Sequence, residues 1–113
     1  MHAKDIGNEA ENIAKQYLLE QGLTYHSNNY HSRAGEIDLV MRDQQEWVFV
    51  EVKYRSNSTH GSAIEYFHAV KRHKFTQTVK HFMHQQRLNP ATVPHRIDVI
   101  AIDGKHISWF KCV

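Results

Sequence analysis

The stretch from residue 35 to residue 53 contains three charged side chains, Asp38, Glu51 and Lys53, that could together form a reactive site. Two apolar runs flank a short polar spacer, which is the pattern of a β-hairpin. With the turn centred on residues 44–45, a simple register sets Asp38 opposite Glu51, with Cβ atoms roughly 5 Å apart. Alternation along the second strand places Lys53 on the same face as Glu51. Two carboxylates and an ammonium group are therefore expected to converge at the open end of one hairpin.

Such a group of side chains suits metal-assisted phosphodiester hydrolysis. Carboxylate oxygens are ligands for Mg²⁺ or Mn²⁺, which keep several waters and also bind substrate phosphate. The ion polarises the phosphoryl group and lowers the pKa of a bound water. Lys53 would orient that water or offset the charge that develops in the transition state, and the backbone carbonyl of Val52 could supply another ligand.

The alternative is an ordinary surface ion pair across the hairpin, which contributes at most about 1 kcal/mol. The near-continuous apolar run at residues 47–50 argues against it, because it predicts a strand covered on both faces. The polar spacer at the other end of the hairpin shows no matching cluster of charges. The pattern alone leaves the two interpretations level.

The surrounding chain predicts a single α/β domain, residues 1–113, with a mixed β-sheet flanked by helices. The expected order is α-β-β-β-α-β-β, with a polar loop at 54–62 before the second helix. A strong two-residue turn is expected at Asp103-Gly104. The other expected elements are a helix at 5–21, a strand at 23–30, the hairpin, a helix within 65–87, and strands at 96–102 and 106–110.

The first helix offers one candidate carboxylate. Glu9 borders the apolar stripe of that helix, whereas Glu11 is expected to lie farther from it. Glu9 is either a first-turn acid favoured by the helix dipole or a carboxylate aimed at the sheet. Periodicity alone favours the dipole role.

The second helix offers a candidate cation. Extending its apolar stripe backwards places Lys71 on the buried side, while Arg72, Lys74 and Lys80 fall on other faces. Lys71 therefore either snorkels past core residues beside a solvated basic face or points into a phosphate-binding cleft. The pattern alone favours the first interpretation, since a charge cluster on one helix is weak evidence.

Composition sets broad limits. The chain has 113 residues, a formal net charge of +2, ten histidines and one cysteine, Cys112. An intrachain disulfide is excluded, and a reducing cytoplasm fits best. No apolar run approaches the roughly 20 residues that span a bilayer. The mild charge permits an anionic partner without demanding one.

Motifs narrow the interpretation. Asp38, twelve intervening residues and Glu51-Val52-Lys53 resemble the PD-(D/E)XK nuclease signature, with Ile37 in place of its proline. The wider pattern resembles the YraN-like family, which is assigned to the PD-(D/E)XK superfamily. It is carried by Gly7-Asn8-Glu9-Ala10, Gly35-Glu36-Ile37-Asp38-Leu39, Val48 to Arg55, Gly61, Lys71 and Arg96-Ile97-Asp98-Val99.

The resemblance implies a restriction-endonuclease-like core and a Mg²⁺- (or Mn²⁺-) dependent endonuclease acting on DNA, with branched or damaged DNA among its substrates. It implies that Asp38, Glu51 and Val52 hold the metal. The first helix also resembles that of archaeal Holliday-junction resolvases, which implies that Glu9 completes the site. The residues expected to meet DNA phosphates are Arg33, Arg55, Lys71 and Arg72.

Two alternatives remain open. One is a catalytically silent nucleic-acid-binding or protein-interaction module that keeps the fold. The other is a metal-binding protein that uses His81 and His84, although no third ligand lies close in sequence. Related nucleases that cut both strands are commonly dimers, so a homodimer is expected by analogy. No membrane partner is expected.

Overall fold

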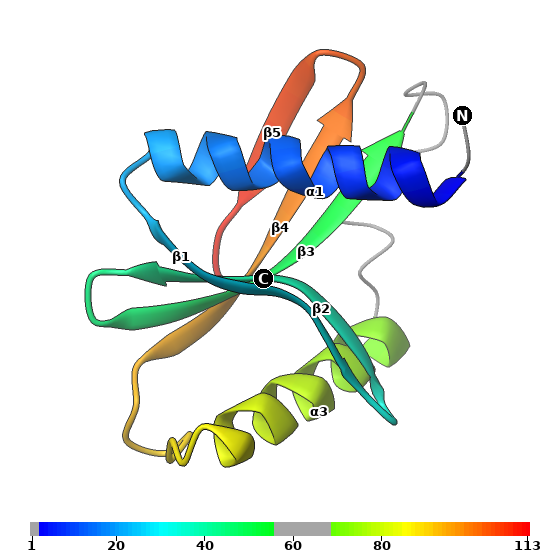
Figure 1. The fold of residues 1–113 in the computed structure, drawn as a ribbon. Helices are drawn as coiled ribbons and strands as arrows, with labels where there is room; N and C mark the ends of the chain where they lie inside the picture. The colour runs from blue at the N-terminus through cyan, green and yellow to red at the C-terminus, as the bar shows by residue number, and fades with distance from the viewer. Residues whose placement is uncertain (1–2, 56–68) are drawn as a thin grey trace.

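Within the described part of the chain, the fold is a five-stranded mixed sheet with a helix on each face (Figure 1). The computed structural model describes residues 3–55 and 69–113. This arrangement confirms the predicted element order and sheet type. The elements are α1 (Ala3–Glu20), β1 (Thr24–Ser32), β2 (Gly35–Asp43), β3 (Glu46–Arg55), α3 (Ala69–Gln85), β4 (His95–Asp103) and β5 (His106–Phe110).

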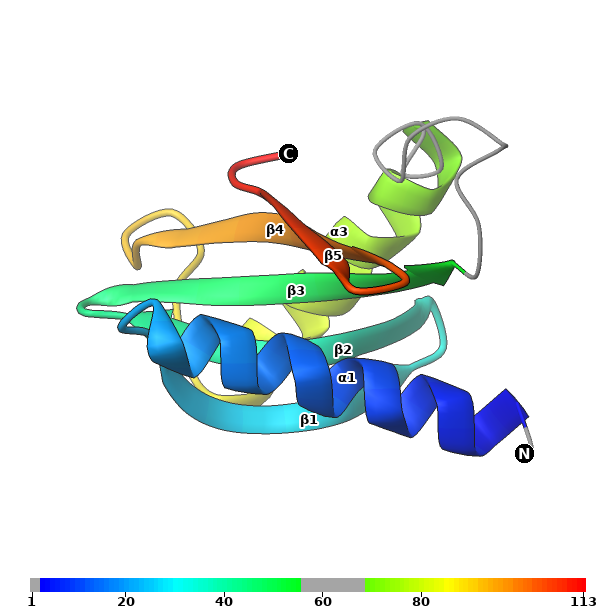
Figure 2. The same ribbon diagram turned by 90° about the horizontal axis from the view of Figure 1, so that it is seen from above.

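The strands lie in the order β1-β2-β3-β4-β5. All neighbours are antiparallel except β3 and β4, which are parallel and are joined through α3. Figure 1 and Figure 2 place α1 and α3 on opposite sides of the sheet. No helix in the described part of the chain is long and apolar enough to cross a membrane.

Each helix covers one half of a two-layered core. On one face, Ala10, Ala14 and Leu18 of α1 belong to a buried cluster with apolar side chains of the central strands. On the other face, α3 buries the stripe that its sequence predicted, which consists of Phe75, Val79, Phe82 and Met83. The two clusters fix both helices against the central strands, where the candidate site lies.

Two turns differ from the sequence expectation. β1 continues to Ser32, so only residues 33–34 separate it from β2. The last hairpin pairs Asp103 with His106, and its turn is therefore one residue later than predicted. The reason is that Gly104 adopts a φ of 61° as the first central residue, which leaves Asp103 free to pair within β4.

The central hairpin has the predicted register. Its ladder runs from Asp43–Glu46 beside the turn to Leu39–Val50. The ladder between β3 and β4 continues five residues further, to Arg55 and Asp103. β3 thus loses its pairing with β2 one step before Asp38 and Glu51, while β4 still supports its other edge.

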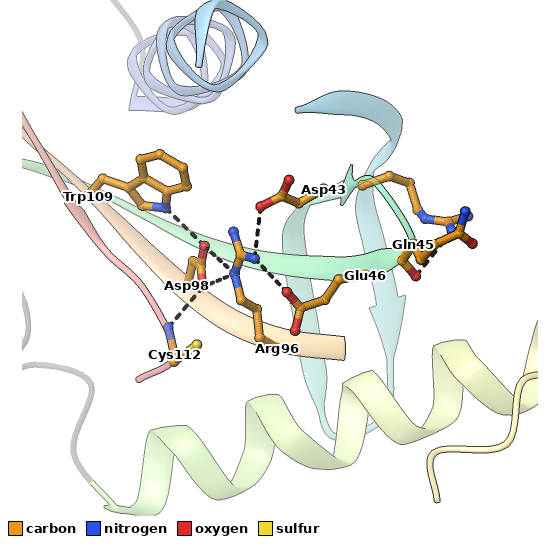
Figure 3. Close-up of polar contacts among 8 residues, drawn as sticks. Asp43, Gln45, Glu46, Arg96, Asp98, Trp109 and Cys112 are labelled. Carbon is orange, nitrogen blue, oxygen red and sulfur yellow. Dashed lines mark hydrogen bonds and ion pairs between the residues drawn. The ribbon is translucent and has the colours of Figure 1, made fainter. Parts of the chain in front are cut away.

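The turn end of the hairpin carries a polar network, contrary to the expectation of no matching cluster there (Figure 3). Arg96 Nη1 lies 3.1 Å from Asp43 Oδ2 and 2.7 Å from Glu46 Oε1, and its Nε donates to both oxygens of Asp98 at 3.1 Å. The parallel pairing of β3 with β4 brings Arg96 to this turn. The hairpin pattern in the sequence does not predict that pairing, so sequence reasoning missed the network.

Asp98 makes this network part of the core. Its side chain is fully buried, and its carboxylate also accepts hydrogen bonds from Trp109 Nε1 at 2.9 Å and from the Cys112 backbone N–H at 3.0 Å (Figure 3). Burial acts to lower the pKa of Arg96, but the carboxylates of Glu46, Asp43 and Asp98 outweigh it and raise that pKa. Paired and hydrogen-bonded in this way, the cluster has a structural role.

Candidate functional site

The candidate site begins where β2 and β3 separate. The backbone N–H of Val52 donates to Asp38 Oδ2 at 2.8 Å, so a side chain takes the place of the missing strand partner. Asp38 is 8% exposed. In a β-strand the N–H and C=O of one residue point to the same edge, which directs the Val52 carbonyl towards Asp38 as well. Asp38 and the carbonyl of Val52 are therefore on the same side of β3, as a shared ligand role requires.

Glu51 is the second carboxylate, and two lysines hold it. Lys71 Nζ lies 2.6 Å from Glu51 Oε1, and Lys53 Nζ lies 3.7 Å from the same oxygen. Glu51 is 7% exposed, whereas both lysine side chains are about one-third exposed. The structure thus brings Lys71, from the first turn of α3, to the carboxylates of the hairpin, as the extended apolar stripe suggested.

The site holds an excess of negative charge away from water. Burial raises the pKa of Asp38 to about 8, helped by the charge of Glu51 and opposed by the Val52 hydrogen bond. The carboxylates of Glu11 and Glu36 raise it further. A carboxyl group in this state is stabilised by a proton or by a cation beside it.

The two lysines have different environments. Burial lowers the pKa of Lys53, and the neighbouring Lys71 ammonium lowers it further. Burial also acts on Lys71, but its contacts with Glu51 and Lys53 outweigh that effect and raise its pKa. Lys53 is consequently the ammonium that gives up a proton more readily than an ordinary lysine.

The first helix contributes Glu11 to this site, which corrects the expectation that Glu11 lies farther from the buried face than Glu9. Burial raises the pKa of Glu11, the charge of Glu36 raises it further, and a hydrogen bond with Asn29 opposes the rise. Glu9 is exposed, and it is not among the charges that act on Asp38.

The reason lies in the rotation of α1. The stripe expected from sequence included Ile13, which is 36% exposed. The buried line runs instead through Ala10, Ala14 and Leu18. At 100° per residue, Glu11 follows Ala10 onto the border facing the sheet, while Glu9 precedes it onto the exposed face.

A hollow of about 190 Å³ opens beside the carboxylates. Glu36 and Glu51 line it from the strands, Lys71 and Lys74 line it from α3, and residues 34–35 line it where β2 begins. We call it the lysine hollow. Two ammonium groups next to a carboxylate pair are the arrangement that would receive a phosphate diester beside a bound cation.

The donor set fits a magnesium-like ion. In residues 3–55 and 69–113, no three His, Cys, Asp or Glu side chains are already gathered as a metal cluster. Mg²⁺ does not require one, since it keeps most of its waters and is held by one or two carboxylates plus phosphate. Asp38 and Glu51, with the Val52 carbonyl, provide oxygen ligands of that kind. A divalent cation beside Asp38 would favour its charged form and would therefore lower the raised pKa of this carboxyl.

Comparison with known proteins identifies the family. A family model described as uncharacterised protein family UPF0102 matches residues 10–102. The chain belongs to this family. The UPF0102 protein of Colwellia psychrerythraea is 42% identical over 111 residues, which cover 95% of this chain and 86% of the relative. Those of Shewanella denitrificans and Vibrio parahaemolyticus are 42% identical over 105 residues (93% and 94% covered) and 44% identical over 110 residues (96% and 90% covered).

UPF0102 is the YraN-like family, so the resemblance inferred from the motifs is confirmed. The range matched by the UPF0102 model contains Glu11, Asp38, Glu51 and Lys53, and it begins one residue after Glu9. The names of these relatives state no activity. Whatever chemistry this UPF0102 protein performs has to be argued from its site.

The three arginines that were expected to meet DNA phosphates differ in their surroundings. Arg33 is exposed in the turn between β1 and β2, next to the lysine hollow. Arg72 is turned to the C-terminal segment, where its guanidinium donates to the Val113 carbonyl at 2.9 Å. Arg55 ends β3, and its side chain lies outside the described residues.

Sequence reasoning missed two participants, Glu11 and Lys74, whereas alternation along the strand already places Glu36 on the same side as Asp38. Glu36 also lies 3.4 Å from His31 across the β1–β2 turn. The spacing of buried alanines, Ala10 and Ala14, was the signal that could have identified Glu11, because small residues mark where a helix approaches a sheet closely.

Proposed function

We propose that this protein is a Mg²⁺-dependent endonuclease that hydrolyses phosphodiester bonds in DNA, with branched or damaged DNA as its substrate. The observation that carries the proposal is the pair of buried carboxylates, Asp38 and Glu51, which are 8% and 7% exposed at the point where β2 and β3 separate. Lys71 offsets the charge of Glu51, which leaves the buried Asp38 to be stabilised by a proton or by a second cation. A cytoplasmic location follows for a DNA-directed protein of this kind.

Each side chain has a distinct role in this proposal. Asp38, Glu51 and the Val52 carbonyl would hold the ion, and Glu11 would contact its waters from α1. When bound, the ion would polarise the phosphoryl group and lower the pKa of water. Lys53, whose pKa is lowered, would orient the attacking water and move its proton. Lys71 and Lys74 would bind the oxygens of the phosphate.

A cleavage panel tests the proposal. Linear, nicked, flapped and four-way DNA of matched sequence are incubated with the protein and Mg²⁺ or Mn²⁺, with EDTA as the control. The proposal expects cleavage of at least one structure, and loss of that cleavage in Asp38→Ala and Glu51→Ala. No cleavage of any structure, or full-rate cleavage by both variants, would reject it.

A second candidate function is a nucleic-acid-binding module without turnover. The Lys71–Glu51 contact of 2.6 Å favours it, because an ion pair already satisfies one of the two carboxylates. This alternative expects binding that weakens steeply with salt and does not depend on Mg²⁺. Retained affinity with no product in the same panel would select it.

The histidine-based metal site has no such support. His81 is hydrogen-bonded to the hydroxyl group of Tyr30, and no cluster of three metal-binding side chains occurs among the described residues.

A homodimer is a separate proposal by analogy, since cutting both strands of a duplex would take two copies of this site. Sedimentation of the protein with and without DNA measures it.

A further inference from the structure

A second hollow, of about 370 Å³, lies on the other side of Glu11. It opens between α1 and β1, and the buried Leu39 forms part of its floor. Glu11 lines this hollow and also acts electrostatically on Glu36 and Glu51, which line the lysine hollow. Glu11 in this hollow is therefore close to the carboxylates that line the lysine hollow.

Most side chains that line this second hollow are polar, and four of them are asparagines. The side of α1 that lines it repeats at helical spacing through Asn8, Glu11, Asn12 and Lys15. Across the gap, β1 contributes Asn28, Asn29 and the ring of Tyr25. The four asparagines that line this hollow are exposed, so a ligand in the open space can reach their amides. We call this space the amide hollow.

Its groups are held in defined positions. The Tyr25 hydroxyl donates to Asn28 Oδ1 at 2.5 Å, and Lys15 Nζ lies 3.9 Å from the centroid of the Tyr25 ring. Asn29 adopts a φ of 53°, and its side chain lies close enough to Glu11 to oppose the rise in the pKa of that carboxyl. The hydrogen bond between Tyr25 and Asn28 fixes the orientation of that amide and of the ring.

We propose that the amide hollow binds one unstacked nucleobase of the DNA strand whose backbone crosses the carboxylates. An asparagine side chain presents a donor and an acceptor together, which matches the edge of a base. Tyr25 offers an aromatic surface next to those amides. A phosphate fits poorly here, because the hollow holds one lysine together with the Glu11 carboxylate.

The proposal deepens the proposed function and rests on it. A volume of about 370 Å³ suits one nucleoside and is too small for a base pair with its backbone. The strand would therefore lie with a phosphate in the lysine hollow and the adjacent base in the amide hollow. Only single-stranded, flapped, junction or damaged DNA offers a base that is free to leave its stack at low cost.

An abasic scan tests the proposal on the full chain. A fluorescein-labelled single strand of about 12 nucleotides is titrated with protein in Ca²⁺, so that affinity is measured without turnover. One abasic nucleotide is moved along the strand, position by position. The expected result is about a tenfold loss of affinity at one position and less than about twofold elsewhere.

Two variants assign that loss to the amide hollow. The double variant Asn12→Ala/Asn28→Ala is expected to lose the position dependence, so that affinity no longer falls at one abasic position. The control is Gln16→Ala, which changes an exposed amide of α1 outside the hollow and is expected to leave the position dependence unchanged. Alanine is well tolerated in a helix, and the thermal midpoint of each variant checks folding. A flat scan for the wild-type protein, or a loss that survives in the double variant, overturns the proposal.

Cleavage of the intact strand in Mg²⁺, measured in parallel, separates the two claims. A flat scan from a protein that cleaves overturns the role of the amide hollow alone. A position-specific loss without cleavage supports the hollow and rejects hydrolysis. No affinity for any strand at low salt overturns both.

Discussion

Lys71 Nζ lies 2.6 Å from Glu51 Oε1 and ties the first turn of α3 to the end of β3 at the candidate site. Glu51 is 7% exposed, so this contact neutralises a carboxylate that water reaches poorly. The same carboxylate is one that we assign to a metal ion. The Lys71–Glu51 pair therefore links the stability of the metal-free protein to the function proposed for it.

Removing this lysine should destabilise the metal-free protein. Lys71→Met leaves Glu51 with only the more distant Lys53, at 3.7 Å, and should cost about 1–3 kcal/mol of unfolding free energy. Lys80→Met, on an exposed position of the same helix, should cost less than about 0.5 kcal/mol. Urea denaturation in EDTA measures both variants. Equal costs for the two lysines would show that the pair contributes nothing.

Asp38 should make stability depend on pH. Its pKa is about 8 in the folded protein and close to the ordinary 3.8 when unfolded, so between these values the folded state keeps a proton that the unfolded state has lost. The contribution of Asp38 to stability thus falls as pH rises from about 4 to 8. Asp38→Asn should remove this dependence and unfold at a higher temperature than wild type at pH 8 in EDTA.

The thermal midpoints of both proteins at pH 5 and pH 8 measure this effect. The gap between variant and wild type should be larger at pH 8, and excess Mg²⁺ should narrow it by stabilising only the wild-type protein. Parallel pH profiles for the two proteins would mean that the Asp38 carboxyl is not perturbed as described.

Glu9 and Glu11 of α1 offer a matched pair of variants. Glu11→Gln removes a carboxylate that acts on Asp38 and should lower Mg²⁺-dependent cleavage 10- to 100-fold. Glu9→Gln changes an exposed position and should leave cleavage within about twofold. Initial rates at several Mg²⁺ concentrations measure both. The reverse ranking would restore Glu9 as the residue that completes the site.

Much of the fold follows from local pattern. The turn at Gln44-Gln45 and the apolar runs beside it predict the hairpin register, and Phe75, Val79, Phe82 and Met83 predict the buried side of α3. In both cases neighbouring residues alone determine the geometry.

Two features of the molecule depend on contacts that local pattern does not contain. The position of Glu11 depends on how α1 is rotated against the sheet, and the exposed Ile13 gave a misleading stripe. The Arg96 network depends on the parallel pairing of β3 with β4, which brings together residues about fifty positions apart.

The Arg96 network should be structural and not functional. Arg96→Met leaves the fully buried Asp98 without its guanidinium partner and should cost about 3–5 kcal/mol of unfolding free energy. At a temperature where the variant is folded, DNA affinity should equal that of wild type. Urea denaturation and binding anisotropy measure the two quantities. A variant that stays stable but loses DNA affinity would instead make this cluster a binding site.

The decisive measurement is single-turnover cleavage of the preferred DNA structure by wild type, Asp38→Asn and Glu51→Gln. Each protein is first shown to be folded and is then assayed in Mg²⁺ and in EDTA. We predict cleavage by wild type in Mg²⁺ alone, and a rate lowered by at least about 100-fold in each variant. Cleavage that persists in EDTA, or that proceeds at the wild-type rate in both variants, would contradict a metal-dependent site built on Asp38 and Glu51.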